Sequence, residues 1–310
     1  MLTRISASLP QSIPVLPHDM PLPTHAAVTR FVASLLPIKE NDVPILYHVP
    51  RRRRYDAELA LIDRIVLSIT PTPGVYPFIG HTGGYHSPRT LVFLHRPWLL
   101  DRRAIRGDTL VLASHTSFDE QLTTGWNPPL AMRLGMTRES WFCVQGYKGD
   151  AERKIGIVGP TSTSRDTILE RIQNEFGQTE LIHEGHSDEI RVVAIMNAFN
   201  EEEVLRVLQM AQERALLPDA SSEAQGRHVL YLTGQPRESG MLAAIALGLT
   251  VACVGHRAAE EWGIRFMAAS MRNAYPDVVV EEVYEEEEPI IRKPKKEVVA
   301  PVLTPVEVAQ

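Results

Sequence analysis

The chain has 310 residues, of which 44% are hydrophobic and 23% charged, and its formal net charge is −6. This composition predicts a globular protein with one large domain or two smaller ones, and it argues against a broad basic surface for nucleic acid. No apolar run approaches the roughly 20 residues that a membrane-spanning helix needs.

The first part of the chain changes character twice. Residues 1–24 are rich in proline and are expected to form an extended, disordered lead-in. The apolar spacing of residues 24–36 predicts a helix that is capped by Thr24 and ends before a proline. A predicted strand at 42–49 is followed by four arginines at 51–54. That run indicates either a solvated loop that can contact phosphate or a nuclear-import signal.

Three segments rich in apolar and β-branched residues predict buried strands. They cover residues 62–70, 90–97 and 108–120. The second and third strands each end in polar side chains, which are His95, His115 and Asp119. In open α/β sheets, sites form just beyond the carboxyl ends of the strands, so these three side chains are expected to meet at one edge.

The rest of the chain alternates helices and strands. Helices are predicted at 128–136, 163–176, 201–217 and 239–248, and strands at 154–160, 190–196, 228–234 and 249–256. The last strand ends at His256, with Glu260 one helical turn further on. An acidic block and then a basic block follow, and residues 285–310 are expected to be disordered.

Five side chains have the chemistry of divalent-metal ligands, since metals are held by carboxylates and neutral imidazoles that converge from several elements. They are His95, His115, Asp119, His256 and Glu260. If a helix begins at His256, the four-residue spacing places it on the same face as Glu260. From spacing alone, a hydrogen-bonded structural role is favoured over a ligand role for any one of these histidines.

Four stretches, in order, resemble motifs of the Nif-three-like family, also called GTP cyclohydrolase I type 2 or YbgI-like dinuclear metal proteins. They are VLSITPTP with VFLHRP (66–73 and 92–97), VLASHTSFDEQLTTGWNPPLAMRLGM (111–136), KIGIVGP (154–160), and YLTGQ with LAAIALGLTVACVGHRAAE (231–235 and 242–260). The likeness covers roughly residues 25–285. It implies an α/β fold of two lobes, in which 25–138 and 226–284 form an outer lobe around a smaller central α+β lobe at 139–225. Family members commonly assemble into hexameric rings.

The resemblance also implies a metal site. Carried over position by position, the ligands are His95, Asp119, His256 and Glu260, and His115 lies beside them as an orienting residue. Glu260 or Asp119 is the expected catalytic base. The second histidine of the family's His-His-Pro motif is Arg96 here, and a guanidinium does not bind metal.

The chain differs from the family's motifs at other positions as well. Gln235 replaces a glutamate, Glu238-Ser239 replaces a histidine pair, and only Asn41-Asp42 echoes an early Asp-Asn motif. Three hypotheses follow for Arg96. It pairs with Asp119 or Glu260 and leaves one ion bound (zinc, iron or manganese) rather than two, or it neutralises carboxylates that have lost their metal, or it points away from a weak second site.

Two functions are therefore in competition. The first is a metal-dependent hydrolase of unknown substrate with a reduced, single-ion site. The second is a non-catalytic ring-forming scaffold, self-associated as a hexamer, that contacts a transcriptional regulator. Nucleic-acid binding through the short basic runs at 51–54 and 293–296 is disfavoured. Cys143 and Cys253 are expected to be buried thiols, and the cytoplasm is the favoured compartment over nucleus and mitochondrion.

Overall fold

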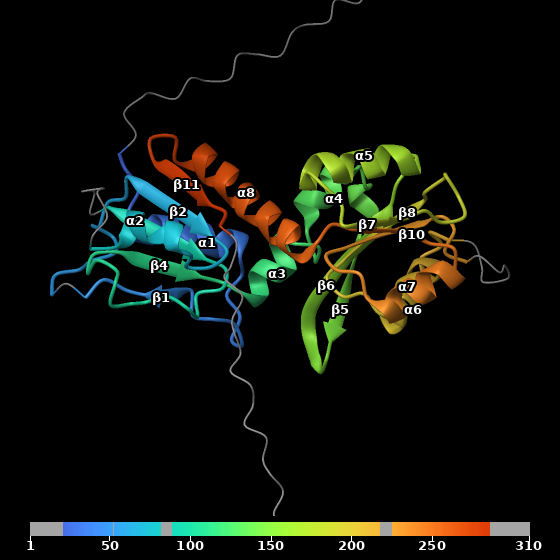
Figure 1. Ribbon diagram of the computed structural model, residues 1–310, viewed down its shortest axis with the longest axis horizontal. Coiled ribbons are helices and arrows are strands. Elements are labelled where there is room, and N and C mark those ends of the chain that lie inside the picture. The colour runs from blue at the N-terminus through green and yellow to red at the C-terminus, as the bar shows by residue number, and fades with distance from the viewer. Residues whose placement is uncertain (1–20, 52, 82–88, 218–224, 286–310) are drawn as a thin grey trace, which may run out of the picture.

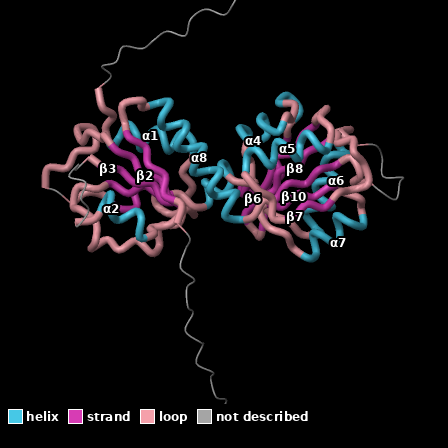
Figure 2. Tube along the Cα trace, turned by 45° about the horizontal axis from the view of Figure 1, so that its top comes forward, coloured by secondary structure: helices cyan, strands magenta, loops and turns pink. Residues whose placement is uncertain are grey.

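The computed structural model describes residues 21–51, 53–81, 89–217 and 225–285, which form two α/β lobes that lie side by side (Figure 1). Each lobe is built on its own sheet, of five and of six strands. Figure 2 shows the two groups of strands as separate layers, with helix α8 lying between them. The fold is thus a two-lobed α/β fold, as the sequence predicts.

The first sheet has the strand order β1-β4-β3-β2-β11. Its strands are β1 (Leu46–His48), β2 (Arg64–Ser68), β3 (Thr90–Leu94), β4 (Leu110–Ala113) and β11 (Val279–Val283). All are parallel except β1. Every residue of β3 and β4 is buried, as expected for strands covered on both faces.

Helices cover both faces of the first sheet. Helix α1 (His25–Leu35) and helix α8 (His256–Ala274) pack on one face, where Val28, Val32, Met267 and Met271 belong to one apolar cluster. Thr24 caps α1 by accepting a hydrogen bond from the backbone N–H of Ala27, as predicted. The short segments η1 (Pro73–Val75) and α2 (Tyr76–Ile79) cover the other face.

The second sheet has the order β5-β6-β8-β9-β10-β7. Its strands are β5 (Phe142–Tyr147), β6 (Asp150–Pro160), β7 (Leu181–His183), β8 (Val192–Met196), β9 (Val229–Thr233) and β10 (Thr250–Cys253). Strands β8, β9 and β10 are mutually parallel and their neighbours are antiparallel.

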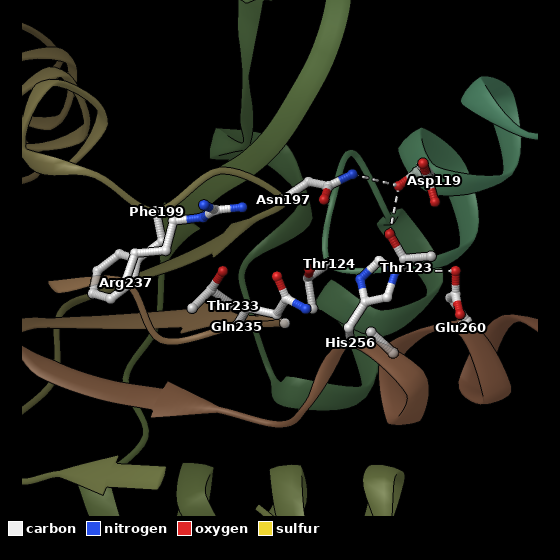
Figure 3. Close-up of a pocket in the computed structure, with 12 residues that line it drawn as sticks. Asp119, Thr123, Thr124, Asn197, Phe199, Thr233, Gln235, Arg237, His256 and Glu260 are labelled. Carbon is white, nitrogen blue, oxygen red and sulfur yellow. Dashed lines mark hydrogen bonds and ion pairs between the residues drawn. The ribbon is translucent and has the colours of Figure 1, made fainter. Parts of the chain in front are cut away.

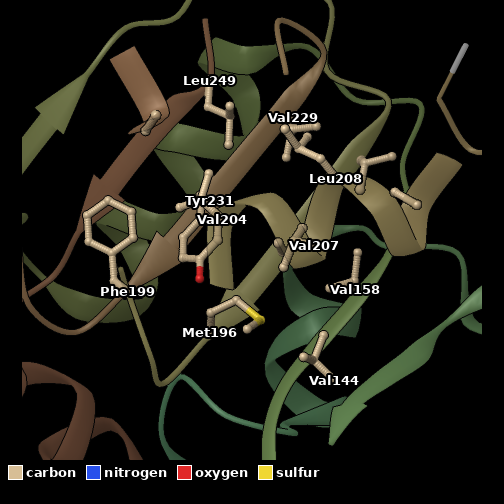
Figure 4. Packing of buried hydrophobic residues seen from close by; sticks show 14 of the residues in the cluster. Val144, Val158, Met196, Phe199, Val204, Val207, Leu208, Val229, Tyr231 and Leu249 are labelled. Carbon is tan, nitrogen blue, oxygen red and sulfur yellow. The ribbon is translucent and has the colours of Figure 1, made fainter. Parts of the chain in front are cut away.

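Two helical layers enclose the second sheet. Helices α4 (Pro128–Leu134) and α5 (Arg165–Phe176) lie over one face. The segment η2 (Arg138–Ser140) follows α4 and leads into β5. Helices α6 (Glu201–Glu213) and α7 (Glu238–Ala246) cover the other. Figure 4 shows this second core, in which Tyr231 and Phe199 pack among aliphatic side chains with ring centroids 5.1 Å apart.

The structure corrects the predicted lobe boundary. Residues 226–284 were expected to belong wholly to the lobe that carries the metal motifs, but β9 and β10 are strands of the second sheet. Strand β9 pairs with β8 from Val192↔Val229 to Met196↔Thr233, so the chain returns to the first lobe only with α8. A buried strand has the same apolar pattern in either sheet, so the sequence of β9 and β10 did not show to which sheet they belong.

Helix α8 joins the two lobes. It begins directly beyond β10 and runs against α3 (Thr116–Leu122) and the first sheet (Figure 1). A Cβ on Gly263 would lie 2.6 Å from the carbonyl oxygen of Leu122, so the glycine permits this close approach. The predicted disordered segments fall largely in 1–20 and 286–310, which lie outside the described residues. Every helix in the described part is too short or too polar for a membrane crossing.

Candidate metal centre

Two neighbouring parallel strands carry the first part of the site. His95 directly follows β3, and His115 follows β4 after one serine and precedes the first residue of α3. Asp119 lies in the first turn of α3. The carboxyl ends of β3 and β4 meet at one edge, so the side chains expected there are close together, as the sequence analysis predicted.

Asp42 holds the start of α3 in place. Its carboxylate accepts hydrogen bonds from the backbone N–H groups of His115, Thr116 and Ser117 at 3.0, 2.9 and 3.0 Å. Burial opposes ionisation, but these backbone hydrogen bonds lower the pKa of Asp42 below its usual value. The Asp-Asn echo in the sequence therefore has a structural role: a carboxylate from a distant segment caps the helix that carries Asp119.

His95 is fully buried at the centre of the cluster. Its Nδ1 lies 3.1 Å from the carbonyl oxygen of Ser114, which can only accept, so Nδ1 carries a hydrogen. Nε2 then faces Asp119 Oδ1 at 3.3 Å and Glu260 Oε1 at 3.1 Å. Although burial disfavours the imidazolium, the two carboxylates raise the pKa of His95 to about 9. Without a metal, a proton occupies Nε2 at neutral pH.

Glu260 contacts three basic side chains although its side chain is only 1% exposed. His95 and His256 approach Oε1 at 3.1 and 3.2 Å, and Arg96 donates to Oε2 at 2.9 Å. Burial opposes its ionisation, but hydrogen bonds from His256 and His95 hold the pKa of Glu260 well below its usual range. His256, half exposed at the first turn of α8, has its pKa raised chiefly by its hydrogen bond with Glu260.

His115 completes a group of potential ligands. Its Nε2 lies 4.0 Å from Asp119 Oδ2, and its buried Nδ1 has no hydrogen-bond partner among the described residues. One ligand atom each from His95, His115 and Asp119 lies within 4.8 Å of the others. Burial lowers the pKa of His115, which favours the neutral imidazole that metals bind. Two nitrogens and a carboxylate oxygen suit zinc, iron or manganese.

The structure brings the five candidate residues together in an arrangement that differs in part from the one the resemblance implies. All five candidate residues lie together, but His115 belongs to the compact group of three instead of standing behind it. Glu260 connects His95 to His256 and Arg96 through the contacts described above. The contact of Arg96 with Glu260 agrees with the first two hypotheses for Arg96, pairing beside one bound ion or neutralising a carboxylate without metal, and disagrees with the third, in which Arg96 points away.

A cavity of about 120 Å³ lies beside the cluster, between the two lobes (Figure 3). This inter-lobe cavity is lined by Asp119, Thr123, Thr124, Asn197, Phe199, Thr233, Gly234, Gln235, Arg237, His256, Ala259 and Glu260. Asn197 and Arg237 come from the second lobe and had not been singled out in the sequence. Both follow strands of the second sheet, β8 and β9, and so the strand-end rule that found His95 could also have found them.

Fold and site together define a two-lobed α/β protein with a histidine and carboxylate cluster at the junction of its lobes. Residues 100–203 match the model of the DUF34/NIF3 (NGG1p interacting factor 3) family. A GTP cyclohydrolase 1 type 2 homolog from Deinococcus radiodurans is 27% identical over 176 residues, which are 56% of this chain and 59% of that relative's length. Over this segment the chain is similar to the NIF3 family, and it spans less than two thirds of the length of the curated relative that it matches.

Solved structures show the same fold. Reduced HcgD from Methanocaldococcus jannaschii aligns with a TM-score of 0.55 and 16% identity over 84% of this chain and 98% of its own. The protein ybgI, of unknown function, aligns with a TM-score of 0.55 and 14% identity over 85% and 99%. The family match includes His115 and Asp119, whereas His95, His256 and Glu260 lie outside it.

Proposed function

We propose that the protein binds one divalent cation through His95, His115 and Asp119 and acts as a metal-dependent hydrolase. The observation that carries the proposal is the convergence of two imidazole nitrogens and a carboxylate oxygen within 4.8 Å from two strand ends and a helix. A bound divalent ion would supply Lewis acidity toward a hydrolytic water. The likeness to a GTP cyclohydrolase 1 type 2 homolog is compatible with hydrolysis but does not specify the substrate.

Charge balance favours one ion over two. Without metal, protonated His95 and Arg96 balance the carboxylates of Asp119 and Glu260. One divalent ion that replaces the proton on His95 raises the net charge of the cluster by only one unit. A second would lie beside the Arg96 guanidinium, which already contacts Glu260 at 2.9 Å, and would be repelled.

The residues of the chain divide the remaining work. Glu260 is surrounded by three basic groups. We therefore propose that it orients His95 and His256 and does not act as the catalytic base that the sequence predicted. Asp119 contacts His95 and belongs to the ligand group. His256 lines the inter-lobe cavity and is half exposed, so it is the side chain best placed to hold or move a proton there.

Metal content per protomer, measured by elemental mass spectrometry on protein purified without a metal-binding tag, tests the proposal. About one ion is expected in the unmodified chain, none in His115→Ala, one in His256→Ala, and a number rising toward two in Arg96→His. Loss of the ion in His256→Ala would instead place it against α8. No ion in the unmodified protein after reconstitution with zinc, manganese and iron would refute the proposal.

The second candidate, a non-catalytic scaffold, is favoured by one observation. Arg96 satisfies Glu260 with a permanent positive charge, so the carboxylates are balanced without any metal. The metal measurement separates the two candidates. Assembly into a hexameric ring and contact with a transcriptional regulator remain predictions.

A further inference from the structure

The inter-lobe cavity contains polar groups that the protein itself does not use. Among the residues that the structure describes, none forms a hydrogen bond or ion pair with the guanidinium of Arg237, the side-chain amide of Gln235 or the hydroxyl of Thr124. Asn197 donates through Nδ2 to the backbone oxygen of Asp119 at 3.3 Å, which leaves its own carbonyl oxygen available. Arg237 and Gln235 are exposed and Thr124 is buried, so a ligand in the cavity can reach all three donors.

The cavity is electrically asymmetric. Asp119, Glu260 and His256 lie at one end, next to the metal ligands, and Arg237 extends in from the other end with its guanidinium directed toward Asn197 (Figure 3). Arg237 is the residue that precedes α7 and belongs to the second lobe, while Asp119 belongs to the first. A ligand in the cavity would therefore contact both lobes, with an anionic group at the Arg237 end.

The size of the cavity limits that ligand. A volume of about 120 Å³ corresponds to roughly ten positions for water-sized atoms. This is room for a compound of about ten non-hydrogen atoms, such as a three-carbon phosphate or a slightly larger carboxylate.

We propose that the inter-lobe cavity binds a small metabolite through an oxyanion, phosphate or carboxylate, held by Arg237 with Gln235 and Thr124 as further donors. The opposite end of the molecule then faces Asp119 and His256, and this orientation toward the cluster rests on the proposed metal-dependent function. A planar guanidinium forms paired hydrogen bonds with either oxyanion, so both sources share the same chemistry.

Isothermal titration calorimetry on the full, metal-reconstituted chain tests the proposal with three probes of equal backbone: glycerol 3-phosphate, glycerate and glycerol. At least one anion should bind, and neutral glycerol should not. The anion that binds identifies phosphate or carboxylate as the preferred group. Arg237→Gln is expected to weaken that binding at least tenfold, which is the effect of losing one charge-assisted pair.

Arg257→Gln is the matched control, because it removes the same charge nearby. Arg257 pairs with Glu261 at 2.7 Å and lines a neighbouring cavity but not the inter-lobe cavity, so its variant should bind the anion within about twofold of the unmodified chain. Equal weakening in both variants, or full binding in Arg237→Gln, would overturn the inference.

Metal content is measured on the same samples. A chain that holds its ion but binds neither anion refutes the ligand class alone, whereas Arg237-dependent binding without any ion refutes the metal proposal alone.

Discussion

Replacement of Glu260 by glutamine tests whether the cluster is held together by buried charge. The variant keeps the shape of the side chain and removes its charge. His95, which is fully buried, would keep only Asp119 as an anionic partner, and Arg96 would lose the carboxylate that it contacts at 2.9 Å. A buried positive charge with fewer partners destabilises the fold.

The magnitude follows from His95. Its pKa is raised from 6.5 to about 9, and this difference corresponds to about 3 kcal/mol of preference for the charged form in the folded state. If Glu260 supplies half or more of the attraction that overcomes burial, Glu260→Gln should lower the free energy of unfolding by about 2–4 kcal/mol.

The pH dependence has a definite sign. A histidine whose pKa is raised on folding contributes its full stabilisation below the unfolded pKa of 6.5, and this contribution is lost as the pH rises through about 9. The metal-free unmodified chain should therefore lose stability between pH 6.5 and 9. In Glu260→Gln this loss should be much smaller, so the two chains should differ more at pH 6 than at pH 9.

Urea unfolding in the presence of a chelator, at pH 6 and pH 9, measures the effect, and an NMR titration of the His95 ring reports its pKa directly. Glu261→Gln is the control, because Glu261 pairs with the partly exposed Arg257 and should change stability by no more than about 1 kcal/mol. Equal stability of the two variants, or a His95 ring that still titrates near 9 in Glu260→Gln, would refute the reasoning.

Two further predictions concern the backbone around the cluster. Asp42→Ala removes the acceptor for three N–H groups at the start of α3 and should cost about 2 kcal/mol, whereas Asp56→Ala, which removes one exposed turn contact, should cost less than about 1 kcal/mol in the same urea assay. Gly263→Ala should separate α8 from α3, because its Cβ would lie 2.6 Å from the oxygen of Leu122. It should cost about 1–3 kcal/mol and lower metal occupancy, while Gly107→Ala, with open space around it, should do neither.

The first half of the site could be predicted from the sequence because it depends on local pattern. Dense apolar runs indicated β3 and β4, and the rule that sites lie beyond strand ends placed His95 and Asp119 together. The same rule brought His115 to that edge, although the family resemblance gave it an orienting role beside the ligands. The sequence did not show the contact by which Asp42, more than 70 residues away, holds the backbone at the start of α3.

Strand β11 was not predicted as a strand, although its residues were assigned to the outer lobe. Its acidic residues indicated the beginning of a charged block, yet Val279–Val283 pairs in parallel with β2. Its acidic side chains are neutralised by arginines from other elements: Arg64 contacts Glu281 and Arg272 contacts Glu282, both at 2.7 Å. Composition alone cannot reveal such partners, because Arg64 and Glu281 are 217 positions apart.

The cluster and the junction of the lobes are parts of one arrangement. Helix α8 leaves the second sheet at β10 and carries His256 toward the inter-lobe cavity and Glu260 into the cluster one turn later. The same Glu260 contacts Arg96 and His95 at the end of β3, so a single carboxylate connects residues of the first sheet to the helix that begins at the second. A metal that displaces the proton of His95 would therefore act on the contacts that join the lobes, and a ligand between Arg237 and Asp119 would bridge the same junction. Metal binding and ligand binding are then expected to reinforce each other, because each stabilises the same placement of one lobe against the other.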